Sequence, residues 1–182
     1  MSSLSTQDVL LVAAERLLEE VGLDGVTTRA VCEVADVKAP TLYHHFGDKN
    51  GLLDALVARG VEAFLTRKRA IAETDDPVAD LVAGFEDFLG FALDRPRLFR
   101  LMVQRVGDNP QVIEAAMAST NVRLTRLAEQ GRLRTEVVFA RRAMMALSNG
   151  VTSLCAQGAS NLEVQEVGRF MLQATLKALV RR

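Results

Sequence analysis

Apolar residues recur every three or four positions along almost the whole chain, the spacing that gives a helix one apolar face. The first such stretch covers residues 5–21. Its apolar stripe consists of Leu10, Ala13, Ala14, Leu17 and Val21. Ser5 or Thr6 is suited to cap the start of this helix, and Gly22 is suited to end it. The acidic residues between the apolar positions predict an amphipathic helix with one solvated face.

The same spacing continues beyond residue 48, first in a long segment of residues 48–72 and then between breaks at Pro77, Pro96 and Pro110. Thr135 is the expected cap of the next helix, and Asn161 is the expected cap of the last one, which we expect to reach the C-terminus. No run alternates apolar and polar residues as a half-buried strand would. We therefore predict an all-α fold of about nine helices and no sheet.

Residues 27–46 predict two short helices joined by a tight turn. Thr27 or Thr28 is suited to cap the first helix. Its expected inner face is Ala30, Val31, Val34 and Ala35. Asp36 falls at the turn, where it tolerates the left-handed conformation better than most non-glycine residues. Pro40 suits the first turn of the second helix, because no backbone donor is missed there. This spacing is that of a helix-turn-helix.

The second short helix has an outer face of a kind that nucleic acid can use. Leu42 and Phe46 are four residues apart and are expected to face inward. The positions left for the outer face are Thr41, Tyr43, His44 and His45, which include the only tyrosine and both histidines of the chain.

The run from Gly22 to Leu56 resembles the DNA-binding domain of TetR-family regulators, and it is especially similar to the tetracycline repressors of that family. The residues that carry the resemblance are Thr27-Thr28-Arg29, Ala35-Asp36-Val37, Pro40 to Phe46 and Lys49 to Leu56. The resemblance implies a three-helix DNA-binding domain over residues 1–50 and a helical ligand-binding and dimerisation domain over residues 51–182.

The resemblance also assigns expected DNA contacts. Arg29 matches a base-reading arginine, and Lys49 matches a phosphate-holding lysine. The full expected set is Thr27, Thr28, Arg29, Lys38, Ala39, Pro40, Thr41, Tyr43, His44, His45 and Lys49. Asp36 stands where the family usually has glycine, and Ala39 and His44 replace a glutamine and a tryptophan. We therefore expect an operator sequence different from that of the tetracycline repressors.

Charge argues against this interpretation. The whole chain has a formal net charge of −1, so no strong global field attracts it to nucleic acid. The first 54 residues hold only four lysines and arginines against nine acids. A DNA-binding domain of this composition must place its few cations well and keep its acids away from the duplex.

The C-terminal part is expected to bind an effector and to form a dimer. In the family, the last two long helices pair with those of a second subunit. The small residues suited to that contact are Ala146, Gly150, Ser153, Gly168 and Ala174, and the expected seam is Met144, Met145, Leu147, Val151, Leu154, Phe170 and Met171. Candidate effector contacts are Phe85, Phe88, Phe99, Met102, Gln104, Met117, Asn121, Met145 and Asn149.

The expected effector is a small apolar or amphipathic molecule, because no histidine lies outside residues 44 and 45 to support a magnesium–tetracycline site. We expect no metal, no cofactor and no enzyme activity, since no motif supplies a nucleophile with its base or a phosphate loop. No apolar run approaches the ~18 residues that span a membrane. Two widely separated cysteines favour a cytoplasmic protein.

Three functions remain open at this point. The first is a ligand-responsive repressor that binds a palindromic operator as a homodimer. The second is an all-α small-molecule carrier or enzyme with a vestigial helix-turn-helix, and the third is an activator or a module that recruits another protein.

Overall fold

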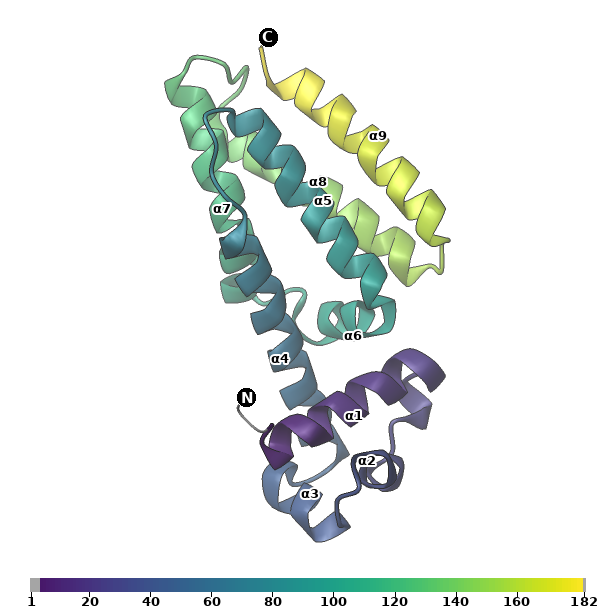
Figure 1. The fold of residues 1–182 in the computed structure, drawn as a ribbon. Coiled ribbons are helices and arrows are strands. Elements are labelled where there is room, and N and C mark those ends of the chain that lie inside the picture. The colour runs from purple at the N-terminus through teal and green to yellow at the C-terminus, as the bar shows by residue number, and fades with distance from the viewer. Residues whose placement is uncertain (1–3, 182) are drawn as a thin grey trace. The chain divides into compact units, whose positions relative to one another are not determined.

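The computed structural model describes residues 4–181 and is built from α-helices (Figure 1). Within that range there are nine α-helices, one short 3-10 helix and no β-strand. The helices are α1 Thr6–Val21, η1 Leu23–Gly25, α2 Thr28–Ala35, α3 Ala39–Phe46, α4 Lys49–Ala70, α5 Pro77–Asp94, α6 Pro96–Val106, α7 Pro110–Glu129, α8 Val137–Ala156 and α9 Asn161–Leu179. The all-α prediction is confirmed.

Two predicted helix caps are wrong by one residue. Helix α8 begins after Glu136, which makes no side-chain cap bond, and the Thr135 hydroxyl donates instead to the Glu136 carbonyl. Helix α9 is capped by Ser160 rather than Asn161, because the Ser160 hydroxyl accepts from the Glu163 amide. The same helix ends at Leu179, short of the predicted end, and residue 182 lies outside the described residues.

The chain forms two compact units. One comprises Met1–Glu62 together with Arg95–Arg105, and the other comprises Ala63–Asp94 together with Val106–Arg182. Helix α4 contributes to both units, and almost all of α6 belongs to the first. Helix α6 lies far from α1 in sequence but packs in the same unit, which sequence periodicity alone does not reveal.

The core of the first unit gathers apolar residues of α1 to α4. Leu10, Ala14 and Leu18 of α1 are buried, and so are Val31 of α2 and Leu42 of α3. Two residues that were predicted to face the core are instead exposed to solvent. Val21 is 59% exposed at the last position of α1, and Val34 is 44% exposed in the last turn of α2, where the short helix leaves the core.

Polar contacts attach α6 to α1 within the first unit. The Glu19 carboxylate accepts hydrogen bonds from the backbone amides of Leu98 at 2.7 Å and Arg97 at 3.3 Å. The Arg97 guanidinium donates to the Leu18 and Glu19 carbonyls at the end of α1. Arg95 pairs with Glu15 at 3.2 Å. A carboxylate at a helix N-terminus satisfies unpaired amides and complements the helix dipole.

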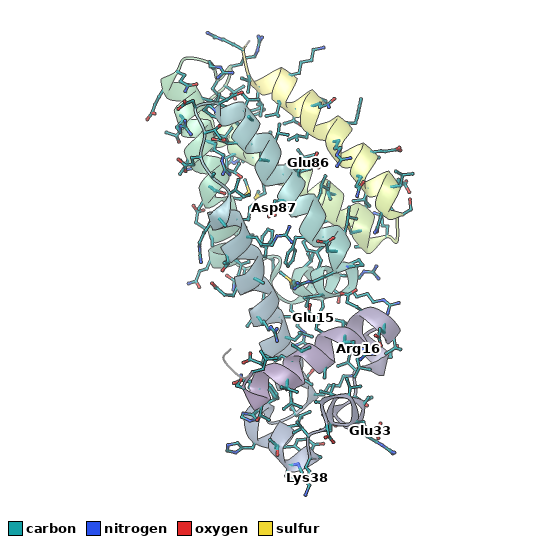
Figure 2. All side chains as sticks on the ribbon, viewed as in Figure 1. Glu15, Arg16, Glu33, Lys38, Glu86 and Asp87 are labelled. Carbon is teal, nitrogen blue, oxygen red and sulfur yellow. The ribbon has the colours of Figure 1, made fainter. Side chains whose placement is uncertain are left out.

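The second unit has an aromatic core with two buried charged residues. Phe85, Phe88 and Phe91 of α5 are all buried, and the Phe91 ring lies 5.1 Å from that of Phe64. Asp80 and Arg123 are each 2% exposed. Figure 2 labels Glu86 and Asp87 on α5, which pair with Arg169 of α9 and Arg67 of α4. The apolar stripes of the helices in this unit thus form a core that encloses charge.

Candidate nucleic-acid interface

Helices α2 and α3 form the predicted helix-turn-helix. The Thr27 hydroxyl caps α2 by accepting from the Ala30 amide at 3.1 Å. Asp36 ends α2 in the left-handed conformation, with φ 52° and ψ 45°. The Val37 amide then donates to the Cys32 carbonyl at 3.0 Å, which tightens the turn. Helix α3 begins at Ala39 with Pro40 in its first turn, where a missing amide costs nothing.

The predicted DNA contacts lie on α2, on α3 and at the start of α4. Eight of them are exposed, namely Thr27, Arg29, Lys38, Ala39, Pro40, Tyr43, His44 and His45. Thr28, Thr41 and Lys49 are half-buried. Leu42, on the opposite side of α3, is fully buried. A helix of this kind offers its polar side chains to a partner while its apolar side holds it in place.

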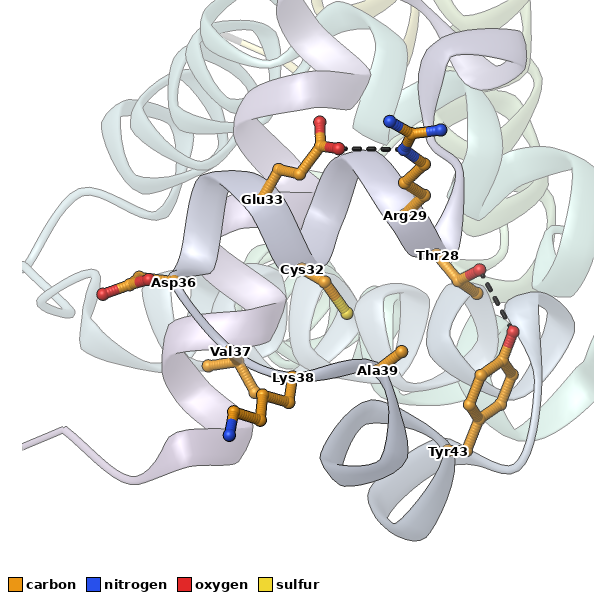
Figure 3. A pocket seen from close by; sticks show the side chains of 9 residues that line it. All are labelled: Thr28, Arg29, Cys32, Glu33, Asp36, Val37, Lys38, Ala39 and Tyr43. Carbon is orange, nitrogen blue, oxygen red and sulfur yellow. Dashed lines mark hydrogen bonds and ion pairs between the residues drawn. The ribbon is translucent and has the colours of Figure 1, made fainter.

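A shallow cavity of about 420 Å³ lies along α2, the turn and the start of α3 (Figure 3). It is lined by Thr28, Arg29, Cys32, Glu33, Asp36, Val37, Lys38, Ala39 and Tyr43. The hydroxyls of Thr28 and Tyr43 approach to 3.4 Å across it. This contact joins the start of α2 to α3, so the two hydroxyl groups have a fixed spacing.

Two cations of this surface already have partners. Arg29 donates to the Glu33 carboxylate at 2.9 Å, and this hydrogen bond and the negative charge of Glu33 raise the pKa of Arg29. Lys49 donates to the Leu23 carbonyl at 3.3 Å. Lys38, at the N-cap position of α3, is exposed. A bound phosphate would compete with Glu33 for Arg29, since both are anionic acceptors.

The acidic balance of the first 54 residues has a structural explanation. Several of the acids serve inside the first unit, where Glu15 and Glu19 hold α6 and Asp54 pairs with Arg105. Residues 95–105 bring four arginines and no acid into this unit, so its nine cations nearly balance its ten acids. The charge objection raised by the linear sequence is therefore much weaker in the folded unit.

Sequence comparisons agree with this geometry. Residues 10–56 match the profile described as "Bacterial regulatory proteins, tetR family", and residues 81–178 match that of the "Tetracyclin repressor-like, C-terminal domain". The second match alone covers more than half of the chain. The chain belongs to the TetR family. It is therefore a helix-turn-helix transcriptional regulator with a TetR-type N-terminal domain and a helical C-terminal domain.

Relatives of the TetR-family chain extend over its whole length. The class A tetracycline repressor protein from transposon 1721 of Escherichia coli is 30% identical over 188 aligned residues, which cover 100% of this chain and 80% of that protein. A solved structure from Rhodococcus sp. RHA1 is 29% identical, covers 98% of this chain and 97% of its own, and has a TM-score of 0.74. A TetR transcription regulator from Haloarcula marismortui reaches a TM-score of 0.83 at 16% identity, over 97% of this chain and 98% of its own, and shows the shared fold.

The candidate effector residues fall in different places. Phe85, Phe88 and Met117 line a cavity of about 20 Å³ in the second unit, together with Lys68, Leu81, Gly84, Thr120, Met144 and Ser148. Asn121 and Met145 are half-buried and Asn149 is exposed. Phe99, Met102 and Gln104 lie on α6 in the first unit, where Gln104 is exposed. The polar residues of the cavity were not predicted, because lysine and threonine in an amphipathic helix look like solvated positions.

No helix among residues 4–181 combines the length and the apolar character needed to cross a bilayer.

Proposed function

We propose that this regulator binds a palindromic DNA operator as a homodimer, represses transcription there and leaves the operator when a small molecule binds its C-terminal domain. The observation that carries the proposal is the exposed surface of α2 and α3, where Arg29, Tyr43 and their neighbours face outward from a buried anchor at Leu42. Arginine can read guanine by two hydrogen bonds, and hydroxyl groups can hold phosphates.

The DNA part of the proposal is tested by gel shift on intergenic DNA next to the protein's own gene. Arg29→Ala and Tyr43→Ala are expected to weaken binding at least about tenfold, because each removes a direct contact. Arg134→Ala, at an exposed arginine between α7 and α8, is the matched control and should bind like the wild type. A carrier with a vestigial helix-turn-helix would instead bind no fragment, and none of the three substitutions would matter.

A groove between α8 and α9 supports the homodimer. It has a volume of about 510 Å³ and is lined by Ala143, Ala146, Leu147, Gly150, Val151, Leu154, Val167, Met171 and Thr175. Beside it, Phe170 is 69% exposed. Of the predicted small residues, Ala146, Gly150, Ser153 and Ala174 are exposed, while Gly168 is buried against Leu89 and Val151. Exposed apolar area of this extent favours an interface, and a palindromic site requires two recognition helices about 34–36 Å apart.

Gly150→Arg tests the dimer without disturbing the subunit. A Cβ at Gly150 would meet no atom within 4 Å, and arginine favours a helix more than glycine does. We expect a folded monomer in sedimentation velocity and a loss of operator binding. Ala118→Arg, at an exposed position of α7, is the control and should remain dimeric. A Gly150→Arg protein that stays dimeric would refute this interface.

Effector release is proposed to act through α4 and α6. Helix α4 runs without interruption from Lys49 to Ala70, and α6 is held to α1 by Glu19 and Arg97. An effector that displaces either helix would alter the spacing of the two recognition helices, and a coupling of about 1–3 kcal/mol is typical of such linkage.

A further inference from the structure

Two cations inside the second unit feel the charge of nearby acids but form no ion pair with a carboxylate among the described residues. Arg123 of α7 is 2% exposed, and its Nε–H has no hydrogen-bond acceptor among the described residues. Lys68 of α4 is half-buried and lies over the Phe64 ring, with Nζ 5.4 Å from the ring centroid. No ion pair joins either side chain to an acid within residues 4–181. Buried cations without partners are costly, so such a pair requires an explanation.

The nearby acids are already engaged. Asp87 of α5 accepts two hydrogen bonds from Arg67 on one oxygen, while its other oxygen is buried without a partner. Asp80 accepts from the Thr74 amide and hydroxyl and pairs with Arg126 at 3.4 Å. Burial and the positive charge of Arg123 lower the pKa of Lys68 to about 8, and Asp87 opposes this only in part.

Lys68 faces the cavity of about 20 Å³ that is walled by α4, α5, α7 and α8. Gly84 lines the same cavity, and a Cβ there would lie 3.2 Å from Nη1 of Arg123, so the guanidinium reaches the cavity wall. Thr120 and Ser148 add hydroxyl groups, and α8 adds no charged residue. The rest of the lining is aromatic, aliphatic and thioether. The cavity lining therefore combines one cation, two hydroxyls and an apolar wall, and the Arg123 guanidinium lies close to the wall at Gly84.

We propose that this cavity binds the carboxylate of a small amphipathic effector, held by Lys68 and Arg123 with its apolar body against Phe85, Phe88 and the methionines. This proposal rests on the effector-binding role proposed above and names the chemical class of the effector. A carboxylate supplies the acceptors that both cations lack, and arginine binds it with two parallel hydrogen bonds. The cavity is large enough for about one water, so the apolar body must displace flexible side chains such as Met117 and Met144.

Three probes of equal shape and different charge test the proposal on the full-length protein without DNA. Benzoate, benzamide and benzamidine carry charges of about −1, 0 and +1 at neutral pH. Isothermal titration calorimetry at pH 7 is expected to show saturable binding of benzoate and none of benzamidine, with benzamide at least about tenfold weaker, as for a lost charge-assisted hydrogen bond. Decanoate and decanamide repeat the comparison for a longer apolar body.

Substitutions locate the site. Lys68→Met and Arg123→Met should each weaken the binding of benzoate at least about tenfold. Lys177→Met replaces an exposed lysine of α9 and should leave the binding of benzoate unchanged. Because the charge of Arg123 also stabilises the ionised form of the buried Asp80, circular dichroism first checks that each variant is folded.

Proton uptake gives a second readout. A bound carboxylate stabilises protonated Lys68, so its pKa should rise on binding. At pH 8.5, calorimetry in buffers of different ionisation enthalpy should show proton uptake in the wild type and none in Lys68→Met. No saturable binding of benzoate and decanoate, or binding of benzamide or benzamidine as tight as that of benzoate, would overturn the proposal. Operator binding is measured separately, so loss of DNA recognition would leave this result intact.

Discussion

Glu19 connects the DNA-binding helices to α6, and its removal has a calculable cost. Its carboxylate accepts from the first two backbone amides of α6, at 2.7 Å from Leu98 and 3.3 Å from Arg97. Loss of an N-terminal helix cap costs about 0.5–2 kcal/mol, and a hydrogen bond to a charged group contributes about 1.5–3 kcal/mol. For the half-buried Glu19, we expect Glu19→Ala to destabilise the protein by about 2 kcal/mol.

Thermal unfolding followed by circular dichroism measures this cost. At this chain length, 1 kcal/mol corresponds to about 2–4 °C, so Glu19→Ala should lower the melting temperature by about 4–8 °C. Glu19→Gln keeps one acceptor, so its melting temperature should lie between those of Glu19→Ala and the wild type. Hydrogen exchange should also become faster in residues 96–100, where the cap is lost.

Glu20→Ala is the matched control, because Glu20 makes only an exposed pair with Arg16 at 2.8 Å. Its melting temperature should change by no more than about 1 °C. If Glu19→Ala and Glu20→Ala unfold at the same temperature and exchange in α6 is unaltered, Glu19 does not hold α6 to α1.

Three further outcomes are expected. Asp36→Gly should raise the melting temperature by about 1–3 °C, because glycine adopts the left-handed φ of 52° without strain; a lower value in thermal unfolding would contradict this. Glu33→Gln should strengthen binding to non-specific duplex in fluorescence anisotropy, because it frees Arg29 and removes a negative charge; weaker binding would mean that Glu33 aligns Arg29. Burial alone would raise the pKa of Asp80, but hydrogen bonds from Thr74 and the charges of Arg123 and Arg126 hold it below its ordinary value of 3.8. Asp80 should therefore stabilise the protein above that pH and lose its contribution as the pH falls. The free energy of unfolding measured in urea should fall less between neutral and acidic pH for Asp80→Asn than for the wild type.

Local sequence patterns were enough to predict the helices and the helix-turn-helix. Asp36 in the turn and Pro40 in the first turn of α3 are determined by backbone preferences of single residues, and the structure has both where the pattern predicts them. The cap at Ser160 was missed because serine and asparagine are equally suited to that position. The start of α8 was missed because it lies at Glu136, which forms no side-chain cap, although the adjacent Thr135 is the better capping residue.

Local sequence patterns could not predict the contacts between residues that lie far apart in the chain. The attachment of α6 to α1 pairs residues 78 positions apart, as in the hydrogen bond from Arg97 to Glu19. Arg123 is buried although arginine is nearly always exposed, so its residue type gave no sign of the buried position. The cationic cavity therefore became visible only when α4, α5, α7 and α8 were seen together.

In the proposed function, α2 and α3 hold DNA in a symmetric pair of subunits. DNase I footprinting across the intergenic region beside the protein's own gene tests it most directly. Two protected half-sites related by twofold symmetry are expected, with centres about 10 base pairs or a multiple of one helical turn apart. The Arg29→Ala, Tyr43→Ala double variant should leave the same DNA unprotected. Protection that lacks this symmetry, or that survives the double substitution, would show that α2 and α3 do not hold DNA in this way.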